Sequence, residues 1–457
     1  MLFLFVEVPS QVSETNSYNC NGFPKFKTLK NFFLSLIFIS VIITGAFAQR
    51  IAPVPAQQNP IAISGGTIHV GNGQVIENGV IVFAAGKIIY AGTGAGAPPM
   101  ANMQMINVQG KQVYPGIIAP NTTLGLDEIG AARATNDYAE TGTYNPGVRS
   151  LVAYNTDSKA IPTLRSNGIL LAQVVPQSGI ISGASSIMQL DAWNWEDAQY
   201  KADDGIHLNW PSYFNFQFTD NVATTSVSDQ YAKQVMEIRQ YFLQAKSYNE
   251  EASHAERNIN FEAMNGLFNS SKTLFIHCDY VKEIINAVQF AKDFKLKVVI
   301  VGGRDSYMCT DVLKENNVAV ILGTPHSLPG GDDVEVELPY ETAHLLYNAG
   351  VKYCLSIGSY WPNRNLPFVA GTTAAFGISK EDALKSITGS TAEILGIAGR
   401  TGTIEAGKDA NIIISTGDVL DMKTSNIEYA FIQGRQINLD NSQKQLYEIY
   451  MKKYGLK

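Results

Sequence analysis

Cysteine is scarce in this 457-residue chain, and the four cysteines do not stand in close pairs. They are Cys20, Cys278, Cys309 and Cys354, with no CxxC pair and no zinc-finger spacing. Disulfide frameworks and thiolate zinc sites depend on such pairs, so the sequence argues against both. The last three cysteines stand in apolar surroundings, and we expect them to be buried free thiols.

Charge is also sparse, since only 16% of the residues are charged and the net charge is -7. The isoelectric point is near 5.5. Nucleic acids and anionic membrane surfaces attract basic patches, so the composition gives no electrostatic reason to expect either partner. Hydrophobic residues make up 45% of the chain, which indicates a globular protein with a large core.

One apolar segment near the N-terminus, Phe32–Gly45, is too short to span a bilayer comfortably. Three lysines between residues 25 and 30 precede it, and Ala46-Phe47-Ala48 follows with the small-x-small pattern of a signal-peptidase site. We therefore expect residues 1–48 to be a signal peptide with an N-terminal extension. The protein would then be exported, periplasmic or secreted, with no membrane contact after cleavage near Ala48. A buried helix or an uncleaved anchor is the alternative interpretation.

Short β-type runs occur at both ends of the remaining chain. After a Pro/Ala/Gln linker at residues 49–60, residues 61–116 alternate apolar and polar positions between glycine turns, which predicts hairpins. Residues 396–440 show the same kind of pattern, and residues 441–457 are expected to form a C-terminal helix. Neither β-rich piece can bury a core alone, so we predict one composite β-sandwich built from both chain ends.

The middle of the chain, residues 117–395, alternates strand and helix patterns. Buried-strand runs at Thr273–Cys278, Lys297–Val301 and Val318–Leu322 are separated by helical periodicity. Repeated over this length, the pattern predicts an α/β fold, a (β/α)8 TIM-like barrel with parallel strands and right-handed crossovers. Residues 188–260 are rich in aromatic residues and lack strand signals, so we predict a mostly helical insertion there.

Four patterns in this order resemble the amidohydrolase superfamily. The first is Pro115-Gly116 followed by an apolar run, where an outer β-domain meets the first barrel strand. The others are Gly168-Ile169 with VVPQSGIISGASS, then GISKEDALKSITGSTAEILGI, then GTIEAGKDANIIIS. They extend over residues 61–440, and the resemblance is closest to imidazolonepropionase-like and dipeptidase-like members.

The resemblance implies a metal centre at the C-terminal ends of the barrel strands. A metal-activated water would there hydrolyse non-peptide C–N bonds. Members of this superfamily place two histidines after strand one, histidines after strands five and six, and an aspartate after strand eight. A bridging residue on strand four serves the two-metal forms. Catalytic zinc needs three nitrogen or oxygen ligands and an open position.

This chain departs from that ligand set at most positions. Only His277 matches, as the fifth-strand ligand, and the fourth strand, placed at residues 172–175, offers only Gln173. We therefore assign no catalytic residue, and expect either no cofactor or a divalent metal such as zinc that His277 helps to hold. The other ligand positions are taken by Asn121, Thr123, Gly302 or Gly303, and Gly358 or Ser359.

Two functions are compatible with this pattern. One is a hydrolase with a residual or rebuilt metal site, for which His277, His326 and an aspartate at residues 332–333 are the candidate ligands. The other is an inactive barrel that binds a small polar molecule, or that partners an active paralogue or forms a homo-oligomer. Candidate pocket residues at the mouth are Asn121, Thr123, Arg304, His326, Ser359 and Asn363.

More ordinary roles remain open for the same residues. His277 is then a strand-end histidine bonded to its neighbours, His326 is a solvent-exposed loop residue, and the polar residues at the mouth fill space. The aromatic residues of the 188–260 segment form a protein-binding surface in a third interpretation. The remaining histidines have no supporting candidate ligands near them in the sequence: His69, His207, His254 and His344.

Overall fold

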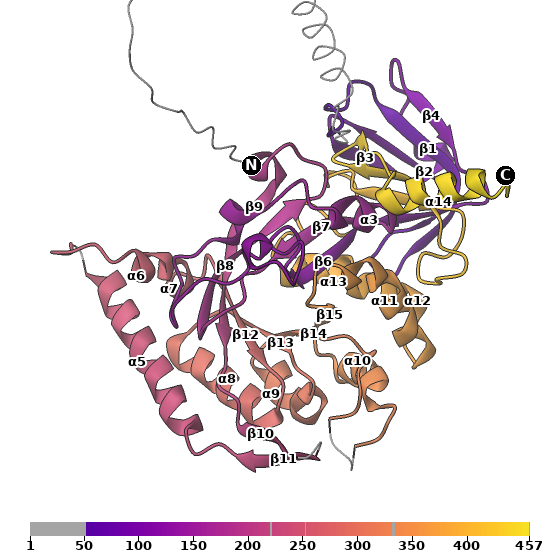
Figure 1. The fold of residues 1–457 in the computed structure, drawn as a ribbon. Helices are drawn as coiled ribbons and strands as arrows, with labels where there is room; N and C mark the ends of the chain where they lie inside the picture. Colours follow the sequence, from indigo (N-terminus) through magenta and orange to yellow (C-terminus); the bar gives the residue numbers. More distant parts are fainter. Residues whose placement is uncertain (1–51, 220–221, 252, 331–333, 457) are drawn as a thin grey trace, which may run out of the picture. The chain divides into compact units, whose positions relative to one another are not determined.

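The protein is represented by a computed structural model that describes residues 52–456 except 220–221, 252 and 331–333 (Figure 1). The predicted signal peptide and Cys20 lie outside these residues. Among the described helices, none is long and apolar enough to cross a membrane. Cys278, Cys309 and Cys354 are free and buried, which confirms the prediction made from their apolar surroundings.

Eight strands form a nearly closed barrel, which confirms the TIM-like class of the prediction. Between β6 and β15, the two ends of this sheet, the described residues contain no strand pairing; the backbone N–H of Ile118 in β6 instead donates to the carbonyl of Ile387, at 3.0 Å. The order along the sheet is β6 (Ile117–Thr122), β7 (Ile169–Val174), β8 (Ile181–Gln189), β9 (Gln199–Asn209), β12 (Thr273–Cys278), β13 (Val298–Gly302), β14 (Ala319–Leu322) and β15 (Tyr353–Leu355).

The third strand of this barrel runs against the others, which the prediction of parallel strands did not include. β8 is antiparallel to both β7 and β9, whereas the remaining neighbours pair in parallel. Only residues 175–180 connect β7 to β8. A parallel crossover needs a dozen or more residues, so a connection of this length forces a hairpin.

The prediction of a mostly helical insertion over residues 188–260 is wrong for its first part. β9 occupies residues 199–209, and a hairpin of β10 (Phe214–Thr219) and β11 (Val222–Val227) follows before helix α5 (Tyr231–Glu250). β9 contains lysine, aspartate and glycine, residue types that are depleted in strands, so its pattern was not recognised. The segment at 172–175 that was predicted as the fourth strand mostly belongs to β7, the second strand of the barrel.

Helices pack against the barrel through apolar faces. In α8 the side chains of Ile284, Ala287, Val288 and Ala291 are buried at helical spacing. Helices besides α5 are α2 (Ser150–Ala153), α3 (Ala160–Ser166), α4 (Trp195–Ala198), α6 (Ile259–Ala263), α7 (Asn265–Phe268), α8 (Val281–Phe294), α9 (Thr310–Glu315), α10 (Leu338–Ala349), α11 (Leu366–Ala375), α12 (Lys380–Ser386), α13 (Gly389–Ile394) and α14 (Ser442–Lys453).

A second eight-stranded sheet takes strands from both ends of the chain. β5 and β16 are neighbours in it, with Val113 opposite Ile414. Both ends therefore contribute to one sheet, and the arrangement of that sheet as a sandwich stays a prediction. Its order is β18 (Arg435–Gln436), β17 (Ile427–Ile432), β16 (Ile412–Ser415), β5 (Gln112–Pro115), β1 (Ile61–His69), β2 (Val75–Ala84) and β3 (Lys87–Thr93), with β4 (Gln104–Asn107) beside β1.

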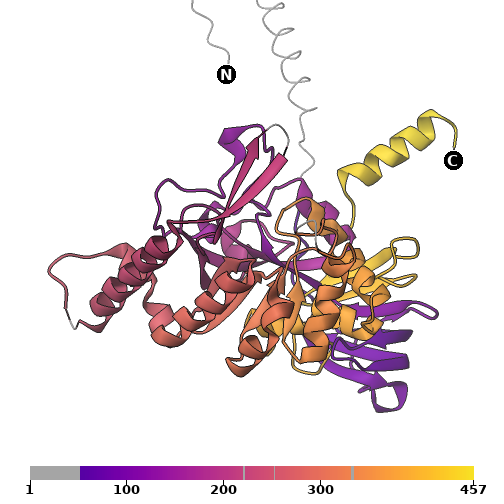
Figure 2. The same ribbon diagram turned by 90° about the horizontal axis from the view of Figure 1, so that it is seen from below.

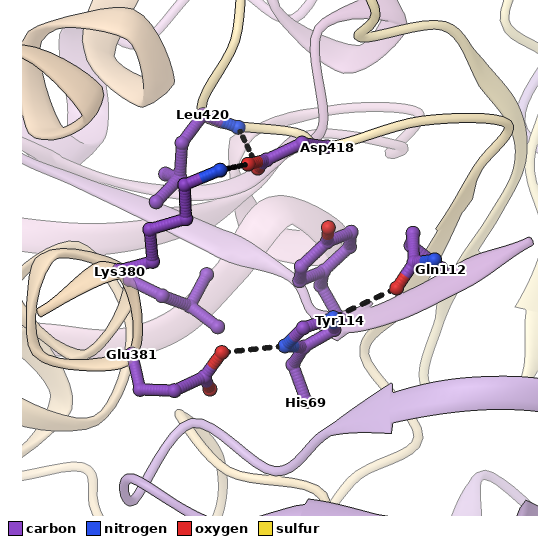
Figure 3. A pocket seen from close by; sticks show the side chains of 8 residues that line it. His69, Gln112, Tyr114, Lys380, Glu381, Asp418 and Leu420 are labelled. Carbon is purple, nitrogen blue, oxygen red and sulfur yellow. Dashed lines mark hydrogen bonds and ion pairs between the residues drawn. The ribbon is translucent and has the colours of Figure 1, made fainter. Parts of the chain in front are cut away.

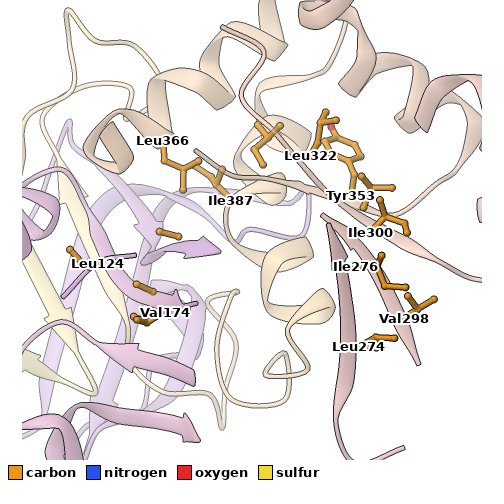
Figure 4. Close-up of a cluster of buried hydrophobic side chains, with 14 of the residues drawn as sticks. Leu124, Val174, Leu274, Ile276, Val298, Ile300, Leu322, Tyr353, Leu366 and Ile387 are labelled. Carbon is orange, nitrogen blue, oxygen red and sulfur yellow. The ribbon is translucent and has the colours of Figure 1, made fainter. Parts of the chain in front are cut away.

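Alternation along the barrel strands separates two buried clusters. Leu274 and Ile276 of β12 belong to the large cluster that packs with the helices (Figure 4). Phe275, between them, belongs to a second cluster that also contains Ile118 of β6 and Cys354 of β15, the two ends of the sheet. A cluster with members from strands all round the barrel lies in its interior, so Phe275 and the other odd-numbered side chains of β12 face inward.

Candidate active site

Two histidines meet inside the barrel near the C-terminal ends of β9 and β12. Nδ1 of His207 is 2.8 Å from Nε2 of His277. The ring of His207 stacks on Phe275, with the centroids 4.7 Å apart and the planes 12° from parallel. Strand register produces this meeting, because His207 stands opposite Phe275 and His277 stands opposite Asn209.

Burial keeps both histidines neutral. It lowers the pKa of His277 to about 4. It also brings the pKa of His207 well below its usual value, and the proximity of His277 acts in the same direction. With both rings neutral, one of the two facing nitrogens donates a proton and the other accepts it. Nε2 of His207 is buried without a hydrogen-bond partner among the described residues, so the pair presents one open donor or acceptor.

A buried polar network links β9 to the end of the first barrel strand. Asp204 accepts hydrogen bonds from Ser185 Oγ at 2.7 Å and from Gln173 Nε2 at 2.8 Å. Gln173 Oε1 in turn accepts from the backbone N–H of Asn121 at 3.2 Å. Burial raises the pKa of Asp204, although both hydrogen bonds act in the opposite direction. The network fixes the backbone at Asn121, one of the predicted pocket residues.

Asn121 and Asn363 carry two further unpartnered polar atoms. Asn121 has a left-handed backbone with φ 51°, which asparagine tolerates better than most residues, and its Oδ1 is buried without a partner among the described residues. Asn363 donates from Nδ2 to Thr122 Oγ1 at 3.0 Å and to the carbonyl of Ser359, while its own Oδ1 is buried and unpartnered within the described chain. Thr123 is buried beside them.

The structure therefore brings together four of the predicted pocket residues around Thr122, whereas the other two make contacts elsewhere. Arg304 lies over the ring of Tyr280, with its guanidinium carbon 4.5 Å from the ring centroid. His326 faces Thr372, with Nε2 2.8 Å from Oγ1, and lines a different cleft with Lys380 and Asp418. The residues brought together are Asn121, Thr123, Ser359 and Asn363.

Sequence reasoning missed His207, which the structure places beside His277, one of the two histidines selected from the sequence. The available signal was the pair of apolar residues Ile206 and Leu208, which flank His207 with strand alternation and lead into the buried Trp210. The glycine and the two aspartates just before this pattern hid it. His207 occupies the fourth barrel strand, and His277 the fifth, as predicted.

The described residues do not form a three-ligand set for catalytic zinc. No three His, Cys, Asp or Glu side chains within the described ranges lie close enough together to hold a metal ion. His207 and His277 supply two nitrogens, whereas a catalytic zinc needs three protein ligands. Asp332 and Asp333, the aspartates considered for a rebuilt site, lie outside the described residues.

A second histidine site lies where the outer sheet meets α12, around a cavity of about 280 Å³ (Figure 3). Nδ1 of His69 is 2.6 Å from Glu381 Oε1, Nε2 is 2.9 Å from Gln112 Oε1, and the ring stacks on Tyr114. Burial lowers the pKa of His69, but the hydrogen bonds with Glu381 and Gln112 and the charge of Glu381 outweigh it, so the pKa is raised overall. This cavity is lined by paired charges, unlike the barrel interior.

Comparisons of sequence identify relatives over most of the chain. The model of the Amidohydrolase family matches residues 244–437. The imidazolonepropionase of Mesorhizobium japonicum is 24% identical over 371 residues, 74% of this chain and 87% of that protein. A 5-methylthioadenosine/S-adenosylhomocysteine deaminase of Symbiobacterium thermophilum is 43% identical, but over only 60 residues, 13% of this chain and 14% of that protein.

Comparison of structures points to the same fold. An amidohydrolase from Thermotoga maritima superposes with a TM-score of 0.72 at 23% identity, covering 83% of this chain and 99% of that one. In the comparison of sequences, a further relative is the imidazolonepropionase of Caulobacter vibrioides, which is 23% identical over 368 residues, 74% of this chain and 88% of that protein. The match of residues 244–437 to the family model, together with the barrel fold and these relatives, supports the amidohydrolase superfamily.

Proposed function

We propose that the barrel mouth binds a small, neutral, polar molecule through hydrogen bonds and does not hydrolyse it by a metal-activated water. The observation that carries the proposal is the neutral His207–His277 pair, which leaves His207 Nε2 buried and open. The superfamily uses metal at this end of the barrel, and the donor set described here is short of a catalytic zinc site.

Unpartnered buried polar atoms give the proposal its energetic basis. Each costs about 1–3 kcal/mol in desolvation unless a partner satisfies it. The unpartnered Asn121 Oδ1 and Asn363 Oδ1 are potential acceptors, and the unpartnered His207 Nε2 is a potential acceptor or donor according to the tautomer of the pair. A ligand with N–H or O–H groups, such as a small amide, urea or cyclic amide, would satisfy such atoms. A neutral ligand suits these three uncharged groups.

Binding can be tested by calorimetry and thermal shift with small amides, ureas and cyclic amides. At a concentration a hundredfold above its Kd, a ligand should stabilise the protein by about 2.7 kcal/mol. His207→Phe retains an aromatic ring on Phe275 but removes both nitrogens, and should weaken binding at least tenfold. His254→Gln is the matched control, because His254 contacts Glu251 at the surface. Equal affinity in wild type and His207→Phe would contradict the proposal.

The second candidate is a hydrolase of non-peptide C–N bonds, the activity class suggested by the resemblance and by the relatives. A specific observation favours it, namely that histidines occupy both the fourth and the fifth strands, where the superfamily places ligands. Metal content of protein purified without chelators distinguishes the candidates. About one equivalent of zinc, manganese or iron that is lost in His277→Ala and retained in His254→Ala would favour hydrolysis and contradict the first proposal.

We also propose that the chain is exported. The basis is the sequence of residues 25–48, with its lysines, short apolar segment and small-x-small site. Sequencing the N-terminus of protein secreted from a suitable host should give Gln49 as the first residue. Retention of residues 32–45 in the recovered protein would contradict cleavage.

A further inference from the structure

The C-terminal helix α14 buries none of its side chains, although it is rich in apolar and aromatic residues. Figure 2 shows it standing away from the sheets and helices that precede it. No apolar partner for this helix exists among the described residues, since its members are absent from all the buried clusters and from the residues packed against them. The exposed fractions are 52% for Leu446, 64% for Tyr447, 61% for Ile449, 52% for Tyr450 and 63% for Tyr454.

The exposed apolar residues lie on one side of the helix. At 100° per residue, Leu446 and Tyr450 share a face, and Ile449 and Tyr454 flank it. The side chains of Lys444, Glu448 and Lys452 project from the opposite side. Lys453 lies on the apolar side, with its Nζ 5.9 Å from the ring centroid of Tyr450 and 5.2 Å from that of Tyr454. Aromatic residues and methionine are enriched at protein interfaces, and Tyr447 and Met451 extend the apolar face. We call the surface formed by Leu446, Tyr447, Ile449, Tyr450 and Tyr454 the α14 face.

The base of α14 is fixed to the body of the protein. Asn441 is buried and caps the helix, accepting from the backbone N–H of Lys444 at 2.9 Å and donating from Nδ2 to Ser166 Oγ at 2.9 Å. Gln443 Oε1 accepts from Thr163 Oγ1 at 2.9 Å. These bonds hold the first turn of α14 against α3.

A helix of this length needs a partner. Isolated helices shorter than about 12–15 residues are marginal in water, and most helices in proteins are stabilised by packing of an apolar face. α14 has 12 residues, so its capped first turn alone does not account for its stability. No described residue of the same chain covers the α14 face, which leaves this face open to another molecule.

Charge identifies the partner that fits. Residues 441–457 contain four lysines and one glutamate, a net charge of +3, within a chain of net charge -7, so residues 1–440 carry -10. A basic helix is attracted to the acidic body of a second copy, whereas two α14 helices packed on each other would bring like charges together. We propose that α14 docks through its apolar face on the body of a second copy, and that two copies exchange these helices about a two-fold axis.

The association can be measured by sedimentation velocity of the full chain with substitutions on adjacent positions. Wild type should be a dimer at micromolar concentration, and Leu446→Lys should weaken association at least tenfold. Gln445→Lys introduces the same residue next to it on the other side of the helix, where Gln445 contacts Asp440, and should remain dimeric. A chain that ends at Asn441 should be monomeric. A dimer in which Leu446→Lys and this truncation associate as tightly as wild type would overturn the proposal.

Hydrogen exchange gives a second, independent measurement. Amides of residues 445–453 should be protected at high protein concentration and exchange rapidly on dilution below the dissociation constant. Exchange that does not depend on concentration would contradict docking on a second copy. A monomeric wild type that binds anionic phosphatidylserine vesicles, and loses that binding in Leu446→Lys, would also overturn the proposal and assign the α14 face to a membrane surface.

Discussion

The His207–His277 pair in the barrel and His69 at the edge of the outer sheet shift the pKa of the same side chain in opposite directions. Inside the barrel each histidine has another neutral ring as its polar neighbour, and burial lowers both pKa values. At the sheet edge burial also lowers the pKa, but the bond to Glu381 outweighs it and the pKa is raised. The carboxylate partner of His69, which the barrel pair lacks, accounts for the opposite direction of its pKa shift.

This contrast fits the two locations. A neutral pair can present a hydrogen-bond donor or acceptor to an uncharged ligand, whereas His69, bonded to Glu381 and Gln112, links β1 and β5 to helix α12. In the proposed function the barrel histidines belong to the binding surface, whereas His69 joins the outer sheet to helix α12. Both sites can be tested through the pH dependence of stability, because the two effects have opposite signs.

The largest expected effect is acid destabilisation of the barrel pair. The folded-state pKa of His277 is about 4, below its ordinary value of 6.5, so the unfolded chain binds more protons between these pH values. Stability is then present above pH 6.5 and lost as the pH falls towards 4, by on the order of 3 kcal/mol for His277. Urea unfolding across this range should show a smaller loss in the His207→Gln/His277→Gln variant. An equal loss of stability in wild type and in the double variant would mean that groups other than these two histidines titrate in this pH range.

Removing one ring of the pair should cost somewhat less. His207→Ala leaves a cavity beside Phe275 and deprives His277 Nε2 of its partner, and we expect a loss of about 2 kcal/mol at pH 7. Urea unfolding at pH 7 measures this effect. His254→Ala, at the surface beside Glu251, is the control and should change stability by about 0.5 kcal/mol or less. Similar losses in both variants would mean that the pair has no special role in the fold.

The sheet-edge histidine should show the reverse pH dependence. Because the pKa of His69 is raised in the folded state, its contribution is fully present below pH 6.5 and disappears as the pH rises through the folded-state pKa. His69→Gln should lose about 1 kcal/mol at pH 5.5 and less at pH 9. Thermal unfolding of both proteins at the two pH values measures the difference, and a larger loss at pH 9 would contradict the ion pair with Glu381.

The smallest effect is expected at the exposed ion pair on the same cavity. Lys380 Nζ lies 2.6 Å from Asp418, with the lysine side chain 72% exposed. Exposed pairs contribute about 0–1 kcal/mol, so Lys380→Met should change unfolding by less than about 0.5 kcal/mol and become neutral in 1 M salt. A loss as large as that of His69→Gln would show that the cavity depends on both pairs.

The sequence predicted those strands whose apolar pattern is not interrupted by buried polar residues. Thr273–Cys278 is apolar on both faces, as a strand between a barrel interior and covering helices must be, and it was predicted with its observed bounds. β9 was not predicted because it buries Asp204 and His207, polar residues that a propensity argument assigns to the surface. The pairing of His207 with His277 depends on strand register across 70 residues of sequence, which no local pattern reveals.

The direction of β8 shows a different limit. Its residues, from Ile181 to Gln189, are all buried, so neither periodicity nor composition reveals whether it runs with or against its neighbours. Only the six-residue connection from β7 decided the direction, and that connection was interpreted as part of a family pattern. Asn121 illustrates the opposite case. It stands where the superfamily pattern has a histidine ligand, and this difference alone predicted a change of chemistry at a position that the structure places in the barrel mouth.

The pairing of β5 with β16 also determines when the outer sheet can be completed during synthesis. Val113 finds its partner Ile414 only after 301 further residues have been made, which takes roughly 15–60 s at ribosomal rates of about 5–20 residues per second. During that interval the edge of β5 has no partner, while the β7–β8–β9 meander can already form from neighbouring segments. The N-terminal strands therefore expose an unpaired, aggregation-prone edge until β16 has been made. A chaperone that shields an open strand edge would act during this interval.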